Sequence, residues 1–403
     1  FTSRVSKSVI IIGSGFAGLS AASFMAKAGW KVTVLEKHAT PGGRARQFSE
    51  AGFTFDMGPS WYWMPDVFER YFNRFEKKTS DYYSLTRLDP SYRIYYAKDD
   101  YLDIPAGVEA LCKLFESLEQ GSSKHLLKFL EEGAYKYDIG INDLVYKPGL
   151  SLLEFADKRL ISGVFKLHVF QSISTYVRKF FKNDRIIKLL EFPVLFLGAT
   201  PQKTPALYSL MNYADMALGT WYPDGGMHKI VEGMEAVATS LGVHFKYSSA
   251  VSNIEVANGR ATGLNVNNVF YKSDYIVAGA DYQHVEQKLL PAASRRYSAH
   301  YWSTRVMAPS SLLFYVGLNK RVKNLLHHTL FFDEDFSLHA REIYEDPKWP
   351  TAPQFYISCP SKTDASVAPP GCENLLILIP VAPGLEDDDA TREKYFNLVI
   401  TRL

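Results

Sequence analysis

Residues 8–36 read SVIIIGSGFAGLSAASFMAKAGWKVTVLE, and this stretch decides the fold of the chain. Residues 8–12 form a run of mostly β-branched apolar residues, which is typical of a strand buried on both faces. Residues 19–28 predict a helix that ends at Gly29, and residues 32–36 predict a second strand. A strand–helix–strand unit of this kind predicts two parallel neighbouring strands in an α/β sheet.

The turn between the first strand and the helix reads GSGFAG at residues 13–18 and has the GxGxxG spacing. Missing side chains there let backbone N–H groups and the positive end of the helix approach a diphosphate. Glu36 closes the second strand, and a carboxylate at that place suits a free ribose 2′-hydroxyl and repels a 2′-phosphate. The stretch therefore predicts a dinucleotide site that disfavours NADP. Glycines needed only for a tight turn and helix packing are the alternative.

A second glycine-rich turn, PGGRA at residues 41–45, follows closely. The two glycines are followed by a fixed cation, Arg44, that could reach a diphosphate. This favours FAD over NAD. An ordinary Pro-Gly turn is the alternative.

Composition narrows the class of protein. The chain has 403 residues, which predicts two domains that can be interleaved in sequence. It carries 45 basic and 43 acidic residues, so charge gives no reason to expect a nucleic-acid partner. Aromatic residues make up 14% of the chain, enough to line a long apolar cavity, although an aromatic-rich core would give the same figure.

Cysteine spacing and hydropathy exclude further classes. Cys112, Cys359 and Cys372 lack the spacing of a zinc knuckle or a redox CxxC, so we expect reduced thiols and no metal site. No apolar run approaches the roughly 18 residues of a spanning helix, and no signal-peptide core precedes the first strand. We expect a cytoplasmic location against a membrane face.

Later segments divide the chain. Asn258-Gly259 predicts a hairpin turn between strands at 251–256 and 261–266. Further strands are expected at 275–278, 312–316 and 375–379, and roughly residues 110–215 have a helical pattern. We expect an FAD-binding domain formed by residues 1–110 and 215–285, and a substrate domain with a helical, membrane-facing part formed by residues 111–214 and 286–403.

Several motifs in order carry a family resemblance. They are FDMGPS at 55–60, YPDGGM at 222–227, GAD at 279–281, LHHT at 326–329, and TD at 363–364 leading to APPGC at 368–372. With the two glycine-rich turns, they resemble the phytoene desaturases and related carotenoid desaturases of the amine oxidase superfamily. The resemblance covers nearly the whole chain. It implies a glutathione-reductase-like Rossmann FAD domain with an interleaved α+β substrate domain.

The resemblance also implies which residues bind FAD. They lie in the glycine-rich segments and at the end of the second strand: Gly13, Ser14, Gly15, Phe16, Ala17, Gly18, Glu36, Lys37, Gly43, Arg44, Ala45, Gly58, Pro59 and Ser60. The backbone of Val251 would lie against adenine. Asp281 is a further candidate, with a helix N-cap as its alternative role. In this family a Gly/Pro-rich segment returns the chain to the flavin, and we expect that segment beyond Leu403.

The implied reaction is the dehydrogenation of a carotenoid. Oxidised flavin accepts a hydride, the remaining cation is delocalised along the polyene, and a proton is lost from the adjacent carbon. No strong base is required, and no catalytic residue is assigned. Phytoene is the family's default substrate, a monocyclic or hydroxylated carotene is the alternative, and quinone or oxygen reoxidises the flavin. Aromatic candidates for the substrate tunnel, each with core packing as its alternative, are Trp61, Tyr62, Trp63, Phe192, Phe196, Tyr208, Trp221 and Tyr222.

Residues 176–192 alternate cations with apolar residues, a composition suited to an anionic membrane surface. The cations are Arg178, Lys179, Lys182, Arg185 and Lys188. A solvated basic helix face over the core is the alternative.

Three other functions stay open at this point. A flavin amine oxidase shares the first two motifs. A carotenoid isomerase would use reduced flavin and leave the substrate mass unchanged. A prenyl-binding escort protein of the same fold would not need FAD.

Overall fold

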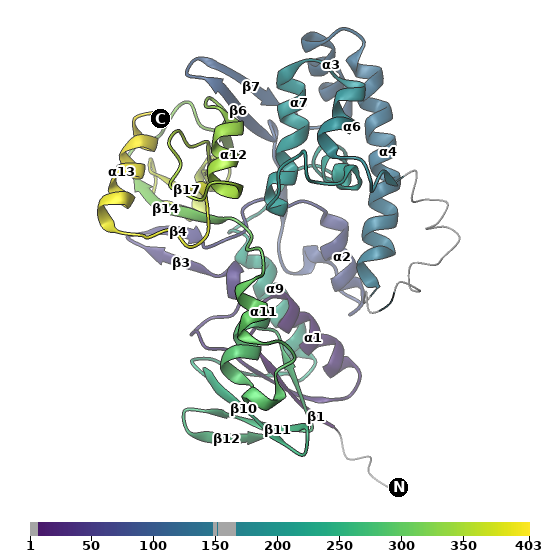
Figure 1. Ribbon diagram of the computed structural model, residues 1–403, viewed down its shortest axis with the longest axis vertical. Helices are drawn as coiled ribbons and strands as arrows, with labels where there is room; N and C mark the ends of the chain where they lie inside the picture. Colours follow the sequence, from purple (N-terminus) through teal and green to yellow (C-terminus); the bar gives the residue numbers. More distant parts are fainter. Residues whose placement is uncertain (1–6, 148–150, 152–166) are drawn as a thin grey trace.

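The computed structural model describes residues 7–147, 151 and 167–403. A parallel four-stranded sheet with the order β13-β1-β2-β9 lies at the lower end of the molecule in Figure 1. Its strands are β1 (Ser8–Ile12), β2 (Lys31–Leu35), β9 (His244–Lys246) and β13 (Tyr275–Ala278). Helix α1 (Phe16–Lys27) joins the parallel neighbours β1 and β2, so the expected strand–helix–strand unit is confirmed.

Different layers cover the two faces of this sheet. Because side chains alternate along β1, Val9 and Ile11 pack toward α1 and α9 (His228–Ser240). Ile10 and Ile12 pack on the other side, against an antiparallel sheet. That sheet contains β10 (Val251–Ala257), β11 (Arg260–Val266) and β12 (Val269–Lys272). This arrangement is the glutathione-reductase-like α/β class that the sequence predicts.

The hairpin between β10 and β11 has the predicted turn. Asn258 and Gly259 have φ angles of 50° and 71°, the left-handed conformations that a two-residue hairpin loop of this kind requires.

A six-stranded mixed sheet, with the order β14-β17-β16-β15-β6-β7, lies at the upper left of Figure 1. Its strands are β6 (Tyr92–Ala97), β7 (Asp100–Ile104), β14 (Ser310–Leu318), β15 (His328–Phe331), β16 (Phe355–Ser358) and β17 (Glu373–Val381). One face packs through Ile377 against Tyr395 and Val399 of α13 (Asp389–Ile400). Tyr356 and Leu378 lie on the other face, which meets the helical part of the molecule.

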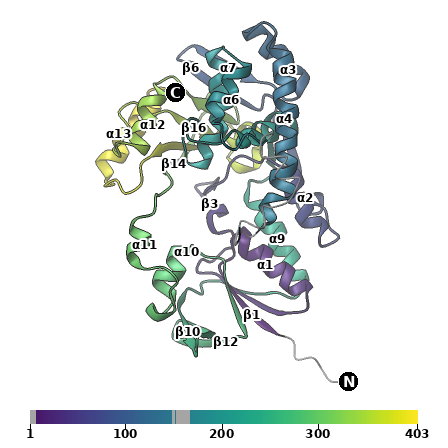
Figure 2. The ribbon, with the colours of Figure 1, turned by 45° about the vertical axis from the view of Figure 1, so that its right-hand side comes forward.

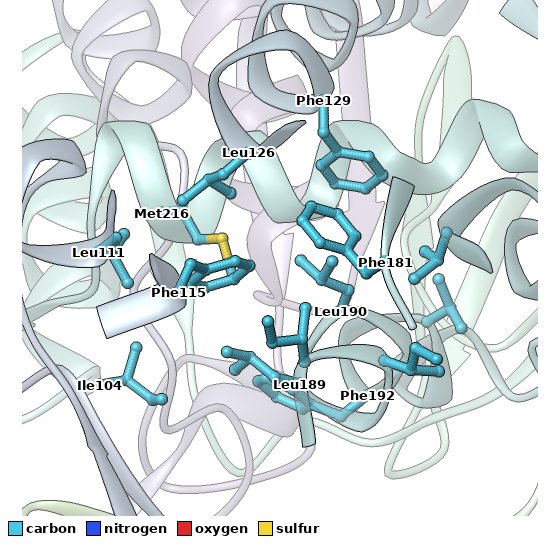
Figure 3. Packing of buried hydrophobic residues seen from close by; sticks show 14 of the residues in the cluster. Ile104, Leu111, Phe115, Leu126, Phe129, Phe181, Leu189, Leu190, Phe192 and Met216 are labelled. Atoms are coloured by element: carbon cyan, nitrogen blue, oxygen red, sulfur yellow. The ribbon is translucent and has the colours of Figure 1, made fainter. Parts of the chain in front are cut away.

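The helical part contains α3 (Val108–Leu118), α4 (Ser122–Asn142), α6 (Ile173–Phe180), α7 (Asp184–Glu191) and α8 (Leu210–Tyr213). It confirms the helical pattern for the described residues. Figure 3 shows its core, where Phe115, Phe129 and Phe181 gather between these helices. The ring of Phe181 lies 5.6 Å from that of Phe115 and 6.0 Å from that of Phe129.

Short elements connect these parts. They are the paired strands β3 (Gln47–Glu50) and β4 (Phe53–Asp56), the paired strands β5 (Leu85–Arg87) and β8 (Trp221–Pro223), and the helices α2 (Pro65–Asn73), α10 (Tyr282–His284), α11 (Ala299–Ser303) and α12 (Phe336–Tyr344). None of the helices in the described ranges is long and apolar enough to cross a membrane.

The strands of the six-stranded sheet come from both sides of the domain boundary that the sequence predicts near residue 110, and the packing near residue 286 also crosses the predicted boundary. Strand β6 pairs with both β7 and β15, so these strands belong to the six-stranded sheet. Beyond the second boundary, Val285 and Leu289 pack against Ile10 of the parallel sheet. Helices α10 and α11 lie beside this sheet in Figure 2. The pairing of β6 with β15 spans more than two hundred residues, and such pairing leaves no local pattern in the sequence.

Candidate functional site

The first glycine-rich turn, residues 13–18, places the start of α1 against the end of β1. Gly13 has a φ angle of 91°, and a Cβ atom on Gly18 would overlap the carbonyl oxygen of Gly13. Gly15 is the N-cap of α1, and within the described part of the chain no side chain caps this helix end. The first backbone N–H groups of α1 are therefore available to an anion.

The second glycine-rich turn touches the first. The backbone N–H of Gly42 donates to the carbonyl oxygen of Ser14 at 2.9 Å. A Cβ atom on Gly43 would lie 3.2 Å from the Cα atom of Gly15, so glycine is what lets the two backbones approach. Arg44 follows in an exposed position, with no hydrogen-bond or ion-pair partner among the described residues. Ala45, next to it, is buried.

The third segment, Gly58-Pro59-Ser60, crosses the second one. A Cβ atom on Gly58 would overlap the carbonyl oxygen of Arg44. Three glycine-containing segments thus bring their backbones together next to the N-terminus of α1, with the exposed residue Arg44 in the second segment. This geometry fits the diphosphate of a dinucleotide such as FAD.

Glu36 lies at the end of β2 and is buried. Its Oε2 accepts from Ser14 N at 2.9 Å and from Ser14 Oγ at 2.7 Å, and its Oε1 accepts from His38 N at 2.9 Å. Burial alone would raise the pKa of Glu36, but these hydrogen bonds outweigh it and lower the pKa. The carboxylate of Glu36 is therefore held ionised at the end of β2, beside the first glycine-rich turn. Ser14, expected as a cofactor contact, points both donors at Glu36.

Other predicted cofactor residues lie around these turns. Phe16 and Ala17 begin α1, and Lys37 is exposed after β2. Val251 begins β10, two residues after Ser249, whose N–H donates to the carbonyl oxygen of Glu36 at 2.8 Å.

Asp281 takes the alternative role that the sequence allowed. It is the N-cap of α10, and its Oδ1 accepts from His284 N at 3.0 Å. It also lies near the first glycine-rich turn, because a Cβ atom on Gly13 would lie 3.6 Å from the carbonyl of Gly279.

Two aspartates tie distant motifs to this site. Asp56 accepts from Met227 N at 2.7 Å and from His228 N at 3.1 Å, at the start of α9. Burial raises the pKa of Asp56 despite these hydrogen bonds. Asp364 accepts from Gly225 N at 2.7 Å and from the hydroxyl of Tyr222 at 3.2 Å. The sequence marked these motifs but gave the two carboxylates no role.

A buried polar chain joins the third segment to the six-stranded sheet. The hydroxyl of Tyr356 donates to Ser60 Oγ at 2.9 Å and lies 2.7 Å from Nδ1 of His328. The indole of Trp61 stacks on the imidazole of His328, with ring centroids 4.0 Å apart. Next to it, Nδ1 of His327 lies 2.8 Å from Thr363 Oγ1. Sequence reasoning assigned nothing to Tyr356, which belongs to none of the quoted motifs.

Two hollows border this chain. The smaller one, about 20 Å³, is lined by residues of the motifs, including Asp56, Ser60, Tyr222, Met227 and His327. The larger one, about 270 Å³, is lined mainly by apolar side chains, among them Phe192, Leu330, Tyr356 and Leu378.

The hollows adjoin the same face of the six-stranded sheet. Ser358 and Leu376 line the smaller hollow, while Tyr356 and Leu378 line the larger one. Residues two apart on a strand share a face, and Tyr356 pairs with Leu378 as Ser358 pairs with Leu376. The two hollows therefore lie one after the other along these strands.

Only some of the aromatic residues predicted to line a substrate tunnel lie at one of the two hollows. Phe192 lines the larger hollow and Tyr222 the smaller one, and Trp61 lies beside Phe192, with ring centroids 6.0 Å apart. Trp61 and the remaining described candidates line neither hollow and pack in or against the cores; these others are Tyr62, Trp63, Tyr208 and Trp221. The side chain of Phe196 lies outside the described part of the structure.

Most of the basic residues at 176–192 have polar partners. Arg178 pairs with Glu191, Arg185 with Asp100, and Lys188 with Asp184. Lys179 donates to Gln171 Oε1 at 2.9 Å. Within the described ranges only Lys182 of the five cations has a side chain without such a partner.

Known proteins are similar to this chain over most of its length. The family model for flavin containing amine oxidoreductases matches residues 16–403. A carotenoid 3,4-desaturase from Haloarcula japonica is 38% identical over 396 residues, 97% of this chain and 79% of that protein. A zeta-carotene-forming phytoene desaturase from Myxococcus xanthus is 32% identical, over 93% of this chain and 72% of that protein.

A solved structure shares the fold. The crystal structure of an oxidoreductase from Methanosarcina mazei superposes with a TM-score of 0.62 at 16% identity, covering 98% of this chain and 82% of that one.

Proposed function

This chain belongs to the flavin-containing amine oxidoreductases, and on that premise we propose that it is an FAD-dependent carotenoid desaturase. It introduces carbon–carbon double bonds into phytoene or into a monocyclic or hydroxylated carotene. The similar proteins from Haloarcula and Myxococcus bear the names of carotenoid and phytoene desaturases, which favours this activity over amine oxidation.

The observation that carries the proposal is the contact between the three glycine-containing segments, next to the smaller hollow and, through Tyr356, to the larger, mainly apolar one. Gly15 meets Gly43, Gly58 meets Arg44, and Ser60 leads directly to Tyr356 at the wall of the larger hollow. A dinucleotide site beside a mainly apolar hollow suits a flavin enzyme with a hydrocarbon substrate.

The proposed FAD contacts are those expected from the sequence. Backbone N–H groups of the turn at 13–18 and the Arg44 guanidinium would bind the diphosphate, and Glu36 would accept from a ribose hydroxyl. Ser14 would act through Glu36. Bound FAD supplies a hydride acceptor.

The residues of the chain would align the substrate and exclude water. Phe192, Leu330 and Leu378 offer an apolar wall that holds a polyene along the sheet. Such a wall also keeps water from the polyene cation, whose charge the conjugated double bonds delocalise.

Two partners and a division of the chain complete the proposal. We propose that the protein collects its lipid-soluble substrate at a membrane surface and that quinone or oxygen accepts its electrons. We also propose an FAD-binding domain that includes residues 285–303, and a substrate domain that includes β6 and β7.

Product analysis tests the proposal. The protein is loaded with FAD and incubated with a quinone and with liposomes that contain phytoene or γ-carotene. We expect products that are lighter by two hydrogens per step and absorb at longer wavelength. Unchanged mass with altered chromatographic retention would instead indicate an isomerase, and peroxide release from polyamines would indicate an amine oxidase. Gly18→Ala, which closes the dinucleotide turn, is the control and should bind no FAD.

A further inference from the structure

The larger hollow meets the solvent along one segment of the chain. Among the residues that line it, the exposed ones are Ala308, Ser310 and Ser311. All three belong to the connection that runs from α11 to β14 along one side of the molecule in Figure 2. The other lining residues, which come from the sheet, from α12 and from the helical part, are buried or half-buried. The mouth of the hollow therefore lies beside residues 308–311.

Two apolar side chains are exposed next to this mouth. Val306 is 99% exposed and Met307 is 69% exposed, and they directly precede Ala308. In the described part of the chain, no other large apolar residue is as exposed as Val306. Single exposed apolar residues are common on protein surfaces, but this pair continues the lining of a mainly apolar hollow. The pair and the hollow thus form one apolar surface.

Positive charge accompanies the pair. Arg305 directly precedes Val306, and its guanidinium donates to the carbonyl oxygen of Tyr301 at 3.2 Å and to Thr304 Oγ1 at 3.3 Å. Both acceptors are neutral, so they leave the charge of the guanidinium uncompensated. Residues 287–332 contain no Asp or Glu, and their basic residues are Lys288, Arg295, Arg296, Arg305, Lys320, Arg321 and Lys323.

Aromatic rings connect a second exposed cation to the same place. The ring of Tyr297 stacks on that of Tyr301, with centroids 4.1 Å apart. The guanidinium of Arg305 lies 4.3 Å from the centroid of the Tyr301 ring, and that of Arg296 lies 5.4 Å from the centroid of the Tyr297 ring. Glu286 is buried, and its carboxylate accepts from the backbone N–H of Arg296 at 3.0 Å. The cations of this cluster, and not the carboxylate, face the solvent.

We propose that these residues dock the protein on a lipid bilayer that contains anionic lipids. We call them the mouth surface: Arg296, Tyr297, Tyr301, Arg305, Val306 and Met307. The inference rests on the proposed function, because a carotene substrate dissolves in the bilayer. The apolar pair enters the acyl layer, the tyrosines lie at the level of the headgroups, and the arginines meet lipid phosphates. The substrate then passes from the bilayer into the larger hollow without crossing water.

Charge complementarity selects this occupant. A bilayer with anionic lipids offers the opposite charge and, beneath it, an apolar layer. A second copy of the chain would instead bring the same cations together across a symmetric interface.

Sedimentation with liposomes tests the docking without any substrate. The double variant Val306→Ser/Met307→Ser removes the apolar pair, and Arg296→Gln/Arg305→Gln removes the two charges. With phosphatidylcholine liposomes that contain phosphatidylserine, we expect the first variant to bind about tenfold or more weakly than the unmodified protein. We expect the second to bind more weakly by about fivefold for each arginine. Without phosphatidylserine, the second variant should bind as the unmodified protein does.

Two substitutions on β12 provide matched controls. Val269 is 55% exposed and Lys272 is exposed, and both lie outside the mouth surface. We expect Val269→Ser/Lys272→Gln to bind liposomes within about twofold of the unmodified protein. Undiminished sedimentation of Val306→Ser/Met307→Ser would overturn the proposal. If this variant also no longer self-associates in size-exclusion chromatography, the surface belongs to a second copy of the chain instead.

Substrate delivery provides a second readout. With carotene supplied in liposomes, we expect Val306→Ser/Met307→Ser to form product about tenfold or more slowly than the unmodified protein. With carotene dispersed in detergent, the two rates should agree within about twofold. An equal loss with both supplies would show a structural defect and overturn the proposal. If the unmodified protein desaturates no carotene from either supply, the proposed function fails, and sedimentation still decides the docking.

Discussion

Glu36 and Ser14 form a buried, hydrogen-bonded pair; Ser14 precedes helix α1 in the sequence and Glu36 follows strand β2. The sequence indicated Glu36 as a ribose acceptor because the fold places it at the end of the second strand. It also indicated Ser14 as a direct cofactor contact, whereas both donors of Ser14 lie on the Glu36 carboxylate. The direction of a side chain within a turn depends on its spatial neighbours, which motif spacing does not specify.

Replacing Glu36 tests this pair. All three protein groups bonded to its carboxylate are donors, so the amide nitrogen of Glu36→Gln would meet at least one donor instead of an acceptor. We expect the dissociation constant for FAD to rise by about tenfold or more, measured by quenching of flavin fluorescence. Glu50→Gln, an exposed change at the end of β3, is the control. Unchanged affinity in Glu36→Gln would contradict the assigned role.

At the scale of elements, a buried network connects strand β6 to the segment after the third glycine motif. Asp215 accepts from the Tyr92 hydroxyl at 2.6 Å and from Thr220 Oγ1 at 2.9 Å. Thr220 Oγ1 accepts in turn from Trp63 Nε1 at 2.8 Å. The network and the burial of Trp63 fit core packing, the alternative role that the sequence allowed for this residue.

Burial raises the pKa of Asp215 from 3.8 to about 6, although its hydrogen bonds act in the opposite direction. Between these values the unfolded chain binds fewer protons than the folded one, so the free energy of unfolding falls as pH rises toward 6. The free energy of unfolding of the unmodified protein, compared with that of Asp215→Asn, should fall by about 1 kcal/mol between pH 5 and pH 7.5. Urea unfolding at the two pH values measures this difference.

Asp274 provides the control for this titration. Hydrogen bonds from Ser8 lower the pKa of Asp274, so its contribution to stability is lost only at pH values below 3.8. The stability difference between Asp274→Asn and the unmodified protein should stay constant between pH 5 and pH 7.5. A constant difference for Asp215→Asn as well would show that Asp215 is not protonated in the folded state near pH 5.

At the scale of the whole molecule, the paired cations leave little free charge on α6 and α7. If the protein docks on anionic membranes through this face, Lys182 should contribute most, because the other four cations already have partners. We expect Lys182→Gln to lower sedimentation with anionic liposomes, and neutralisation of all five cations to lower it further. Equal sedimentation of every variant would place the contact elsewhere.

Local patterns predicted much of this molecule, and long-range pairing limited the rest. The strand–helix–strand unit, the Asn258-Gly259 hairpin and the strands within β14 and β17 follow from local periodicity and turn chemistry. The position of β6 does not, because it pairs with β15 more than two hundred residues later. Tyr356 was missed for the same reason, since its importance comes from lying between Ser60 and His328.

Anaerobic reduction of the bound flavin by a carotene tests the central claim most directly. The FAD-loaded protein is mixed with carotene-containing liposomes in the absence of quinone and oxygen, and flavin absorbance is followed before the pigments are extracted. The account predicts one flavin reduced for each double bond formed, with a product lighter by two hydrogens. A flavin that stays oxidised with every carotene but is reduced by an amine would contradict it.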